Sequence, residues 1–222
     1  MDTRTRAFQH FKKADQRFHA AAYPYKNVLP AELSTHSNKD KLFAALCRTV
    51  VSQQLGTAAA RTIYERFVAA CGGKLTPESV AKADAKKLRA AGLSGSKTKT
   101  LKAVAEAVSK KKIDLLGLRH VTEDEAKSRL TEIWGIGPWS AEMFLMFSLG
   151  RSDVFSPGDL GLARAIEALY GLPKNASRED LAAIAARWSP YRTFASLALW
   201  QIRDATPLLT RGKSRSLRSG SR

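Results

Sequence analysis

The chain has 222 residues, of which 44% are hydrophobic, so it can bury the core of one domain or of two small lobes. Its apolar runs are far shorter than the roughly 20 residues that a bilayer span requires, and its N-terminus lacks the apolar segment of a signal peptide. We therefore expect a cytoplasmic, nucleoid-associated protein, or a nuclear one in a eukaryote, and no membrane partner. Two cysteines, Cys47 and Cys71, are too few for a disulfide framework, a four-cysteine zinc site or an iron–sulfur cluster.

The charge balance is strongly basic, with 37 Lys and Arg against 20 Asp and Glu and a formal net charge of +17. Five of the basic residues lie in 211–222, a segment without an acidic residue that we predict to be a disordered basic tail. Without these five the net charge is still +12, so the folded part is itself basic. A polyanion is the expected partner, and nucleic acid is favoured over membrane because no segment joins a strong apolar face to a basic one.

In chain order, the first half of the sequence reads as helices separated by glycine and serine, with no alternating stretch typical of a strand. One helix has an apolar face made of Leu42, Phe43, Leu46 and Val50. The next carries Ile63 and Phe67 and is stopped by Gly72 and Gly73, and a third runs to Gly92. We expect Ser96 to cap a fourth helix, whose apolar stripe comprises Leu101, Val104, Ala105 and Val108.

The second half continues the helical pattern. Thr122 and Glu125 have the spacing of a capping box, and the inner face that follows comprises Ala126, Leu130 and Ile133. Pro138 suits the first turn of the next helix, which Gly150 ends. Later helices are expected to start near Asp159, Ser177 and Pro190. The predicted fold class is all-α.

Between two of these helices lies the decapeptide WGIGPWSAEM, which starts at Trp134. Its segment Gly135-Ile136-Gly137 reads as a hairpin between helices, in which each glycine can adopt a positive φ. Without side chains, the backbone N–H groups can approach an anion closely, helped by the positive end of the helix that begins at Pro138. Phosphate is the natural anion for a basic protein. The alternative is an ordinary helix–helix turn in which the glycines serve only as caps.

The segment LTEIWGIGPWSAEMFLMFSLGRSDVFSPGDLGLARAI, residues 130–166, resembles the helix-hairpin-helix DNA glycosylase superfamily, and most closely its alkylpurine branch, the 3-methyladenine glycosylase II type. Three more blocks match that branch in the same order: VVSQQLGTAAARTIYERF, GLSGSKTKTLKAVAEA and RWSPYRTFASLALW. The resemblance implies two helical lobes with the active-site cleft between them. It divides the chain into an N-terminal segment at 1–40 that packs with the C-terminal lobe, a hairpin-containing lobe at 41–150, a C-terminal part at 151–210 and the tail.

The sequence departs from its relatives in ways that narrow the activity. The N-terminal β-rich lobe of longer members is missing, and no cysteine follows Cys71, which excludes the iron–sulfur type. Relatives with lyase activity have a lysine two residues after the second hairpin glycine, where this chain has Trp139. In DVFSPGDLGL the proline stands one place later than is usual, while the aspartate keeps its register.

That aspartate, Asp159, is the candidate catalytic residue. Cleavage of an N-glycosidic bond develops positive charge on the sugar, which a nearby carboxylate stabilises more in the transition state than in the ground state. It can also orient the attacking water. Asp159 alternatively caps the following helix, a role worth about 1 kcal/mol that is compatible with catalysis. The neighbouring Asp153 reads as loop structure.

The resemblance also implies a pocket for a base flipped out of the duplex. It places Trp139, Trp200 and Met143 at pocket positions, where electron-rich rings attract a cationic alkylated base. Trp134 and Trp188 are predicted to belong to the core.

The DNA-contacting residues that the resemblance implies fall in two segments. Gly135, Ile136, Gly137 and Pro138 form the hairpin, and Gln53 or Gln54, with Leu55 as the alternative, is the wedge that enters the duplex or contacts the orphaned base. The resemblance also implies that the hairpin can hold a monovalent cation with the main-chain carbonyls of Thr131, Ile133 and Gly135; no other cofactor is expected. The four histidines show no metal-ligand spacing.

The sequence therefore predicts a monomeric, monofunctional DNA glycosylase that acts on double-stranded DNA containing damaged bases. It would flip and excise alkylated purines such as 3-methyladenine and 7-methylguanine, leaving an abasic site. Two alternatives stay open: a glycosylase for deaminated or etheno-adducted bases, and a non-catalytic damage binder that uses the hairpin only to hold phosphate.

Overall fold

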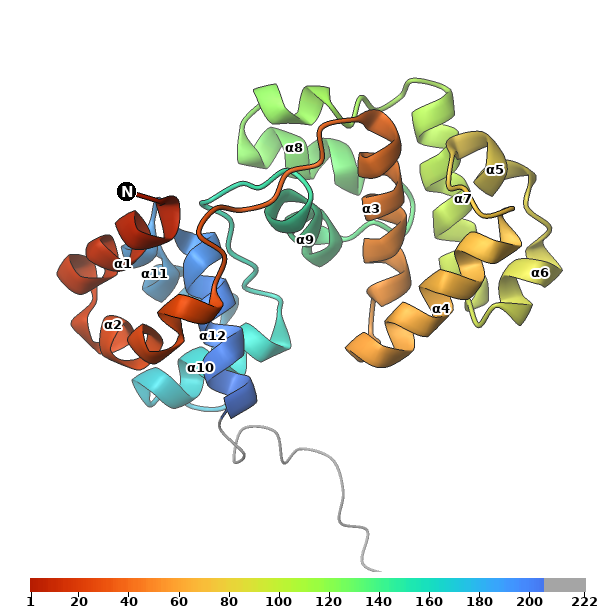
Figure 1. Ribbon diagram of the computed structural model, residues 1–222. Coiled ribbons are helices and arrows are strands. Elements are labelled where there is room, and N and C mark those ends of the chain that lie inside the picture. The colour runs from red at the N-terminus through yellow and green to blue at the C-terminus, as the bar shows by residue number, and fades with distance from the viewer. Residues whose placement is uncertain (206–222) are drawn as a thin grey trace, which may run out of the picture. The chain divides into compact units, whose positions relative to one another are not determined.

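The computed structural model describes residues 1–205, which form twelve α-helices and three short 3₁₀-helices, with no strand among them (Figure 1). The predicted all-α fold class is confirmed for this part of the chain. The tail predicted at 211–222 lies outside the described residues. Within residues 1–205, no helix combines the length and the apolar character needed to span a membrane.

The chain is organised as two compact units. One is built from two separate stretches, Met1–Glu32 and the chain from Phe155 onward, and we name it the split unit. The other is the uninterrupted stretch Leu33–Val154, named the continuous unit. The boundaries expected from the sequence at 40/41 and 150/151 differ from these by eight and by four residues.

The split unit consists of α1 (Thr3–Ala14), α2 (Gln16–Ala22), η1 (Tyr23–Val28), α10 (Leu160–Tyr170), α11 (Arg178–Ala185), η3 (Ala186–Trp188) and α12 (Arg192–Ala205). Helix α12 packs against α10 and also against α2 (Figure 1). The core is aromatic: the Phe18 ring lies 5.0 Å from that of Phe11 and 4.6 Å from that of Trp188, and all three side chains are fully buried. Trp188 is therefore a core residue, as predicted.

One buried carboxylate joins the two stretches of the split unit. Asp15 caps α2 by accepting the Phe18 N–H at 2.9 Å, and its other oxygen accepts the Tyr170 hydroxyl at 2.5 Å and the Trp188 indole N–H at 3.3 Å. Burial and the Asp15 carboxylate raise the pKa of Tyr170 far above its usual range, so its hydroxyl remains a donor. A buried charge satisfied in this way specifies how α2 meets the C-terminal helices.

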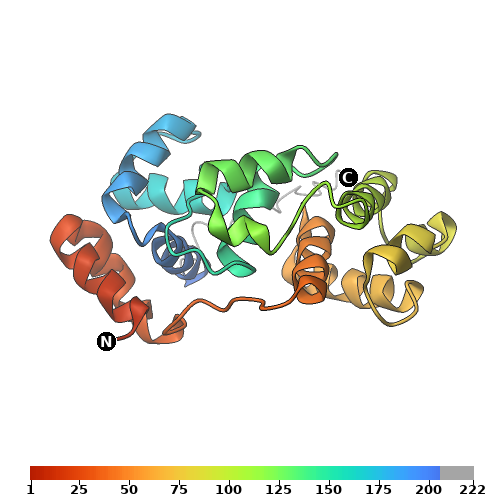
Figure 2. The ribbon, with the colours of Figure 1, turned by 90° about the horizontal axis from the view of Figure 1, so that it is seen from above.

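The continuous unit consists of α3 (Lys39–Ser52), α4 (Thr57–Ala70), α5 (Pro77–Lys82), α6 (Ala85–Ala90), α7 (Gly95–Ser109), η2 (Gly117–His120), α8 (Glu123–Thr131) and α9 (Pro138–Phe147). Helix α3 packs against α4, α7 and α9, while α8 packs on α9 and α5 on α7 (Figure 2). The face of α3 that contacts them is the predicted one, with Leu42, Phe43, Leu46 and Val50 buried.

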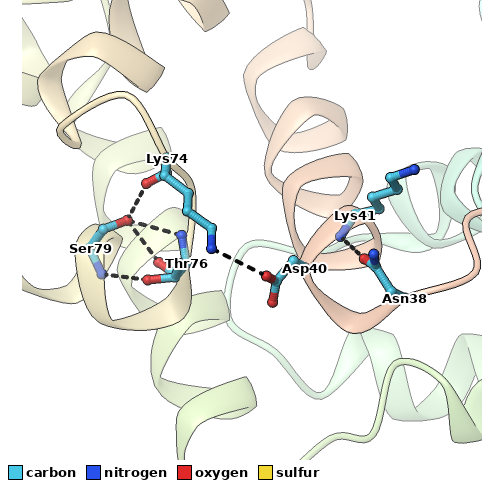
Figure 3. Close-up of polar contacts among 6 residues, drawn as sticks. All are labelled: Asn38, Asp40, Lys41, Lys74, Thr76 and Ser79. Atoms are coloured by element: carbon cyan, nitrogen blue, oxygen red, sulfur yellow. Dashed lines mark hydrogen bonds and ion pairs between the residues drawn. The ribbon is translucent and has the colours of Figure 1, made fainter.

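Side-chain caps begin most of the helices. Within residues 1–205, nine of the helices α1–α11 have an N-cap side chain that accepts a backbone N–H, and the two without one are α4 at Gly56 and α9 at Gly137. Figure 3 shows two of the caps: Asn38 on α3, and a reciprocal capping box between Thr76 and Ser79 on α5. The Lys74–Asp40 ion pair between them, at 3.7 Å, is mostly exposed and adds little stability.

Three details of the helix prediction are wrong. The cap of α7 is Ser94, which accepts the Lys97 N–H at 3.2 Å, rather than Ser96. The predicted third helix is two short helices, α5 and α6, because Asp84 caps a new start. Thr122 does cap α8, but the Glu125 side chain pairs with Arg129 at 2.6 Å instead of completing the box.

Candidate active site

The hairpin between α8 and α9 is anchored by its central residue. Ile136 is only 4% exposed, and its N–H donates to the Ile133 carbonyl at 3.0 Å. Gly135 has a φ of +83°, and a Cβ built there would overlap the Thr100 side chain on α7. The fold itself therefore requires glycine at position 135.

Gly137 is a different case. It is the N-cap of α9 with φ −94° and ψ 175°, so this glycine does not use the positive φ that it could adopt. A Cβ built there would meet no atom within 4 Å, and no side chain caps the helix. Neither the backbone conformation nor the packing therefore requires glycine at position 137. Because glycine has no side chain, there is room for a group from outside the fold beside the positive end of α9. The exposed Pro138 follows it.

The three predicted wedge residues separate into two kinds. Gln53 donates from its side-chain nitrogen to the Gly135 carbonyl at 3.2 Å and to the Ser140 hydroxyl at 2.8 Å. Gln54 and Leu55 are exposed instead, and Gln54 has a φ of +56°. The hairpin and the segment after α3 are thus brought together, but only Gln54 and Leu55 present their side chains outward.

The residues predicted to line a base pocket lie in both units. In the continuous unit, Trp139 is half-buried in the first turn of α9, and Met143, one turn later, is 6% exposed. In the split unit, Trp200 on α12 is half-buried, and its indole N–H donates to Asp159 at 3.1 Å. Trp200 therefore offers a hydrogen bond as well as a ring, which its apolar sequence context did not indicate.

Asp159 is the N-cap of α10, as the sequence predicts. Its Oδ1 accepts the Leu162 N–H at 2.9 Å and the Trp200 indole N–H at 3.1 Å. Two donors from different helices fix the position of the carboxylate. The next residue, Leu160, is 67% exposed. Asp153 lies in a turn, as expected for loop structure.

Trp134 corrects a sequence prediction. The sequence predicts a core residue, but Trp134, which follows the end of α8, is 46% exposed. The Lys99 ammonium lies 4.0 Å from the centre of its ring. Beside it is a cavity of about 230 Å³ lined by residues of α7, α8 and the segments that follow them, among them Ala103, Ile113, Arg129 and Ile133.

The main-chain carbonyls of Thr131, Ile133 and Gly135 fit the monovalent cation that the resemblance implies. The Ile133 and Gly135 oxygens each accept one hydrogen bond, from the Ile136 N–H and from Gln53, and a carbonyl oxygen has a second lone pair. Neutral carbonyl oxygens are the ligands that monovalent cations prefer. In residues 1–205 no three His, Cys, Asp or Glu side chains are grouped as a metal site.

The two cysteines are not reactive. Burial raises the pKa of Cys71 to about 11 and that of Cys47 still further, so both are inert thiols.

The described part of the chain is helical and without strands. One of its helices begins at a glycine hairpin that offers no capping side chain, and another begins at an aspartate. These are features of a helix-hairpin-helix DNA repair protein. The family model described as "HhH-GPD superfamily base excision DNA repair protein" matches residues 47–190. The chain belongs to this family, which confirms the superfamily inferred from the hairpin and its flanking blocks.

The relatives point to the same branch. The chain is 32% identical to DNA-3-methyladenine glycosylase 1 of Schizosaccharomyces pombe over 73% of each chain, and 29% identical to the alkylbase DNA glycosidase-like protein mag2 of that yeast over 89% of this chain and 92% of the relative. It is also 30% identical to the putative DNA-3-methyladenine glycosylase YfjP of Bacillus subtilis, of which the match spans 58%.

Two solved structures are similar over nearly the whole chain. A DNA-3-methyladenine glycosidase from Bacillus halodurans is 34% identical with a TM-score of 0.73, covering 90% of each chain. The 3-methyladenine DNA glycosylase Mag1 of Schizosaccharomyces pombe, in complex with abasic DNA, is 32% identical with a TM-score of 0.73, covering 88% of this chain and 95% of Mag1. The alkylpurine branch predicted from the sequence is thereby confirmed.

Proposed function

We propose that the protein is a monofunctional DNA glycosylase that hydrolyses the N-glycosidic bond of alkylated purines, such as 3-methyladenine and 7-methylguanine, in double-stranded DNA. The observation that carries this proposal is the fixed carboxylate of Asp159, held by Leu162 and Trp200 at the start of α10. The 3-methyladenine glycosylases among its relatives support the substrate class.

The chemistry needs a negative charge at a defined place. As the bond to the base breaks, positive charge develops on the deoxyribose, and a carboxylate that is already oriented stabilises it without further reorganisation. Asp159 is such a carboxylate, because two N–H donors hold its Oδ1. It also serves to orient the attacking water, whose addition to the sugar leaves an abasic site.

The base must leave the helical stack before its bond can be cut. Trp139 supplies a ring for the extruded base, and the ring of Trp200 serves the same purpose while its N–H holds Asp159. Alkylated purines such as 3-methyladenine carry positive charge, which favours stacking on indole rings and makes the base a good leaving group. No strong general acid is therefore required.

The hairpin binds the backbone of the duplex outside the damaged base. The bare backbone at Gly137 and the positive end of α9 suit a phosphate, and a monovalent cation held by the carbonyls of Thr131, Ile133 and Gly135 would add positive charge there. Such contacts carry no sequence information, which suits an enzyme that must search all DNA. We propose that it acts as a monomer.

Lyase chemistry is excluded from the proposal because Trp139 occupies the position where a Schiff base would need an amine. Abasic product should therefore remain uncut until alkali or heat is applied. Spontaneous strand cleavage, or a covalent DNA adduct trapped by borohydride, would contradict this part of the proposal.

Incubation with methylated duplex DNA, followed by chromatographic identification of the released bases, tests the proposed function. Release of 3-methyladenine and 7-methylguanine is expected from the wild type and not from Asp159→Asn. Release only from deaminated or etheno-adducted DNA would change the substrate class, and tight binding without release of any base would show a non-catalytic damage binder.

A further inference from the structure

The Gln53 side chain ties the end of α3 to the hairpin. Its amide nitrogen donates to the Gly135 carbonyl and to the Ser140 hydroxyl, which lie on opposite sides of Gly137 along the chain. The Ser140 side chain is 2% exposed, so this acceptor is itself fixed in place. One side chain thus connects the segment after α3 to the residues before and after the bare start of α9.

Lys97 holds the same segment from α7. Its ammonium donates to the carbonyl oxygens of Val51 and Gln53, both at 2.7 Å. Carbonyls at the end of a helix lack helical partners and carry the negative end of its dipole, so a cation is favoured there. Partial burial lowers the pKa of Lys97, and the two carbonyls replace water around its charge.

Directly after these two attachments, which both involve residues 51–53, the chain is strained and exposed. Gln54 has a φ of +56°, a conformation that costs a non-glycine residue about 1 kcal/mol or more and persists only where the surroundings impose it. The Leu55 N–H closes the turn by donating to the Ser52 carbonyl at 3.2 Å, while its side chain stays 37% exposed. Gly56 then begins α4 without a side-chain cap.

We propose that Gln53 and Lys97 are positioning residues, which hold the Gln54–Leu55 turn in the shape in which it enters DNA and at a fixed offset from the hairpin. The inference rests on the proposed function. Gln53 is then no wedge: it acts through Leu55 and Gln54, which fill the gap left by the extruded base. A turn that is already shaped loses little conformational freedom when it enters the duplex, and small errors in such positioning are costly for rate.

The test uses Gln53→Met and Lys97→Met, which keep the length of the side chain and remove its hydrogen-bond donors. The control is Lys99→Met. Lys99 lies two residues after Lys97 on α7 and stacks on Trp134, so this variant also loses a positive charge from α7. Single-turnover base release at saturating enzyme should fall about tenfold in the first two variants and less than twofold in Lys99→Met. Fluorescence of 2-aminopurine placed beside the lesion should rise less in the first two, because the stack opens less. Thermal unfolding curves ensure that all variants are folded at the assay temperature.

A double-substitution cycle separates positioning from direct contact. If Gln53 acts through Leu55, adding Gln53→Met to Leu55→Ala should cause less than a twofold further loss, and the loss should be the same opposite all four bases. Losses that multiply, a dependence on the opposite base, or an unchanged rate in Gln53→Met would overturn the inference.

Failure of the proposed function has a separate signature, since wild-type protein would then release no base from methylated DNA. In that case the 2-aminopurine signal on a duplex carrying an abasic analogue still tests the turn. A smaller signal in Gln53→Met and Lys97→Met than in the wild type supports positioning, and equal signals in all four proteins overturn it.

Discussion

Two helices begin beside the residues that carry the proposed function, and they begin in opposite ways. Helix α9 starts at Gly137, which has no side chain to offer its N–H groups, whereas α10 starts at Asp159, whose carboxylate accepts the Leu162 N–H. Both starts have the positive end of a helix dipole. In α10 the chain supplies its own anion, and in α9 we propose that a phosphate from outside takes that place. The same local electrostatics therefore suits binding in one place and chemistry in the other.

The largest effect is expected from Asp159→Asn. Asparagine caps helices about as well as aspartate, so α10 should keep its start while the negative charge is lost. We expect base release to fall by about 10²- to 10³-fold with little change in melting temperature or in affinity for damaged DNA. Single-turnover release assays and thermal unfolding check this. If activity survives within about tenfold, Asp159 serves only as a cap.

Gly137→Asp would give α9 the kind of start that α10 has. The φ of −94° and the free space around position 137 admit a side chain, so the fold should persist with an equal or slightly higher melting temperature. A carboxylate facing DNA phosphate should weaken binding to damaged and undamaged duplex alike, by about tenfold or more.

Gly137→Ala is the matched control for that change and should weaken binding less than Gly137→Asp does, because it adds a methyl group without charge. Fluorescence anisotropy on both duplexes, with circular dichroism of each variant, makes the comparison. Unchanged DNA binding by Gly137→Asp would contradict the proposal that the start of α9 contacts a phosphate.

Trp139→Ala tests whether the residue after the bare helix start meets the base rather than the backbone. Excision should fall by about 5- to 150-fold, most for cationic lesions, since a stacked base is worth about 1–3 kcal/mol. Binding to undamaged duplex should stay within about twofold of wild type. An equal loss of undamaged binding would mean that Trp139 supports the hairpin, and the pocket assignment would then be withdrawn.

The smallest effect is expected from deletion of residues 211–222, which carry five positive charges and neither helix start. The slope of log affinity against log salt should flatten by about 0.9 for each tail cation that contacts a phosphate, while base release at saturating enzyme stays within about twofold. Affinity measured across a salt series checks this. An unchanged slope would show that the tail does not touch DNA.

Features that depend on neighbouring residues could be predicted from the sequence. The Asp159 cap, the hairpin at 135–137 and the buried face of α3 each follow from residues within two turns of one another. Ser94 and Ser96 show the limit of this reasoning, because both stand near the start of α7 and only the structure shows which one reaches an N–H.

Features that depend on distant residues could not be predicted. Gln53 is one of the predicted wedge candidates, and only the structure shows its hydrogen bond to the Gly135 carbonyl, 82 residues away in the sequence. The hydrogen bond from the Trp200 indole to Asp159, 41 residues away in the sequence, is likewise shown only by the structure. Trp134 is predicted to be a core residue, but it is 46% exposed, and its ring is stacked with Lys99, which lies 35 residues earlier on α7. The residue pattern within one segment does not show which residues of a distant segment contact it.

The division of the split unit into two stretches has a consequence for how the protein is made. A ribosome synthesises α1 and α2 before the other helices of the split unit. The Phe18 ring, which contacts Phe11, also packs on Trp188, a residue that is synthesised more than 150 residues later. At about 5–20 residues per second, that delay is on the order of ten to thirty seconds, during which the continuous unit can complete its own contacts. The N-terminal helices thus spend this interval with an apolar face exposed, and they are the segment on which a nascent-chain chaperone would act.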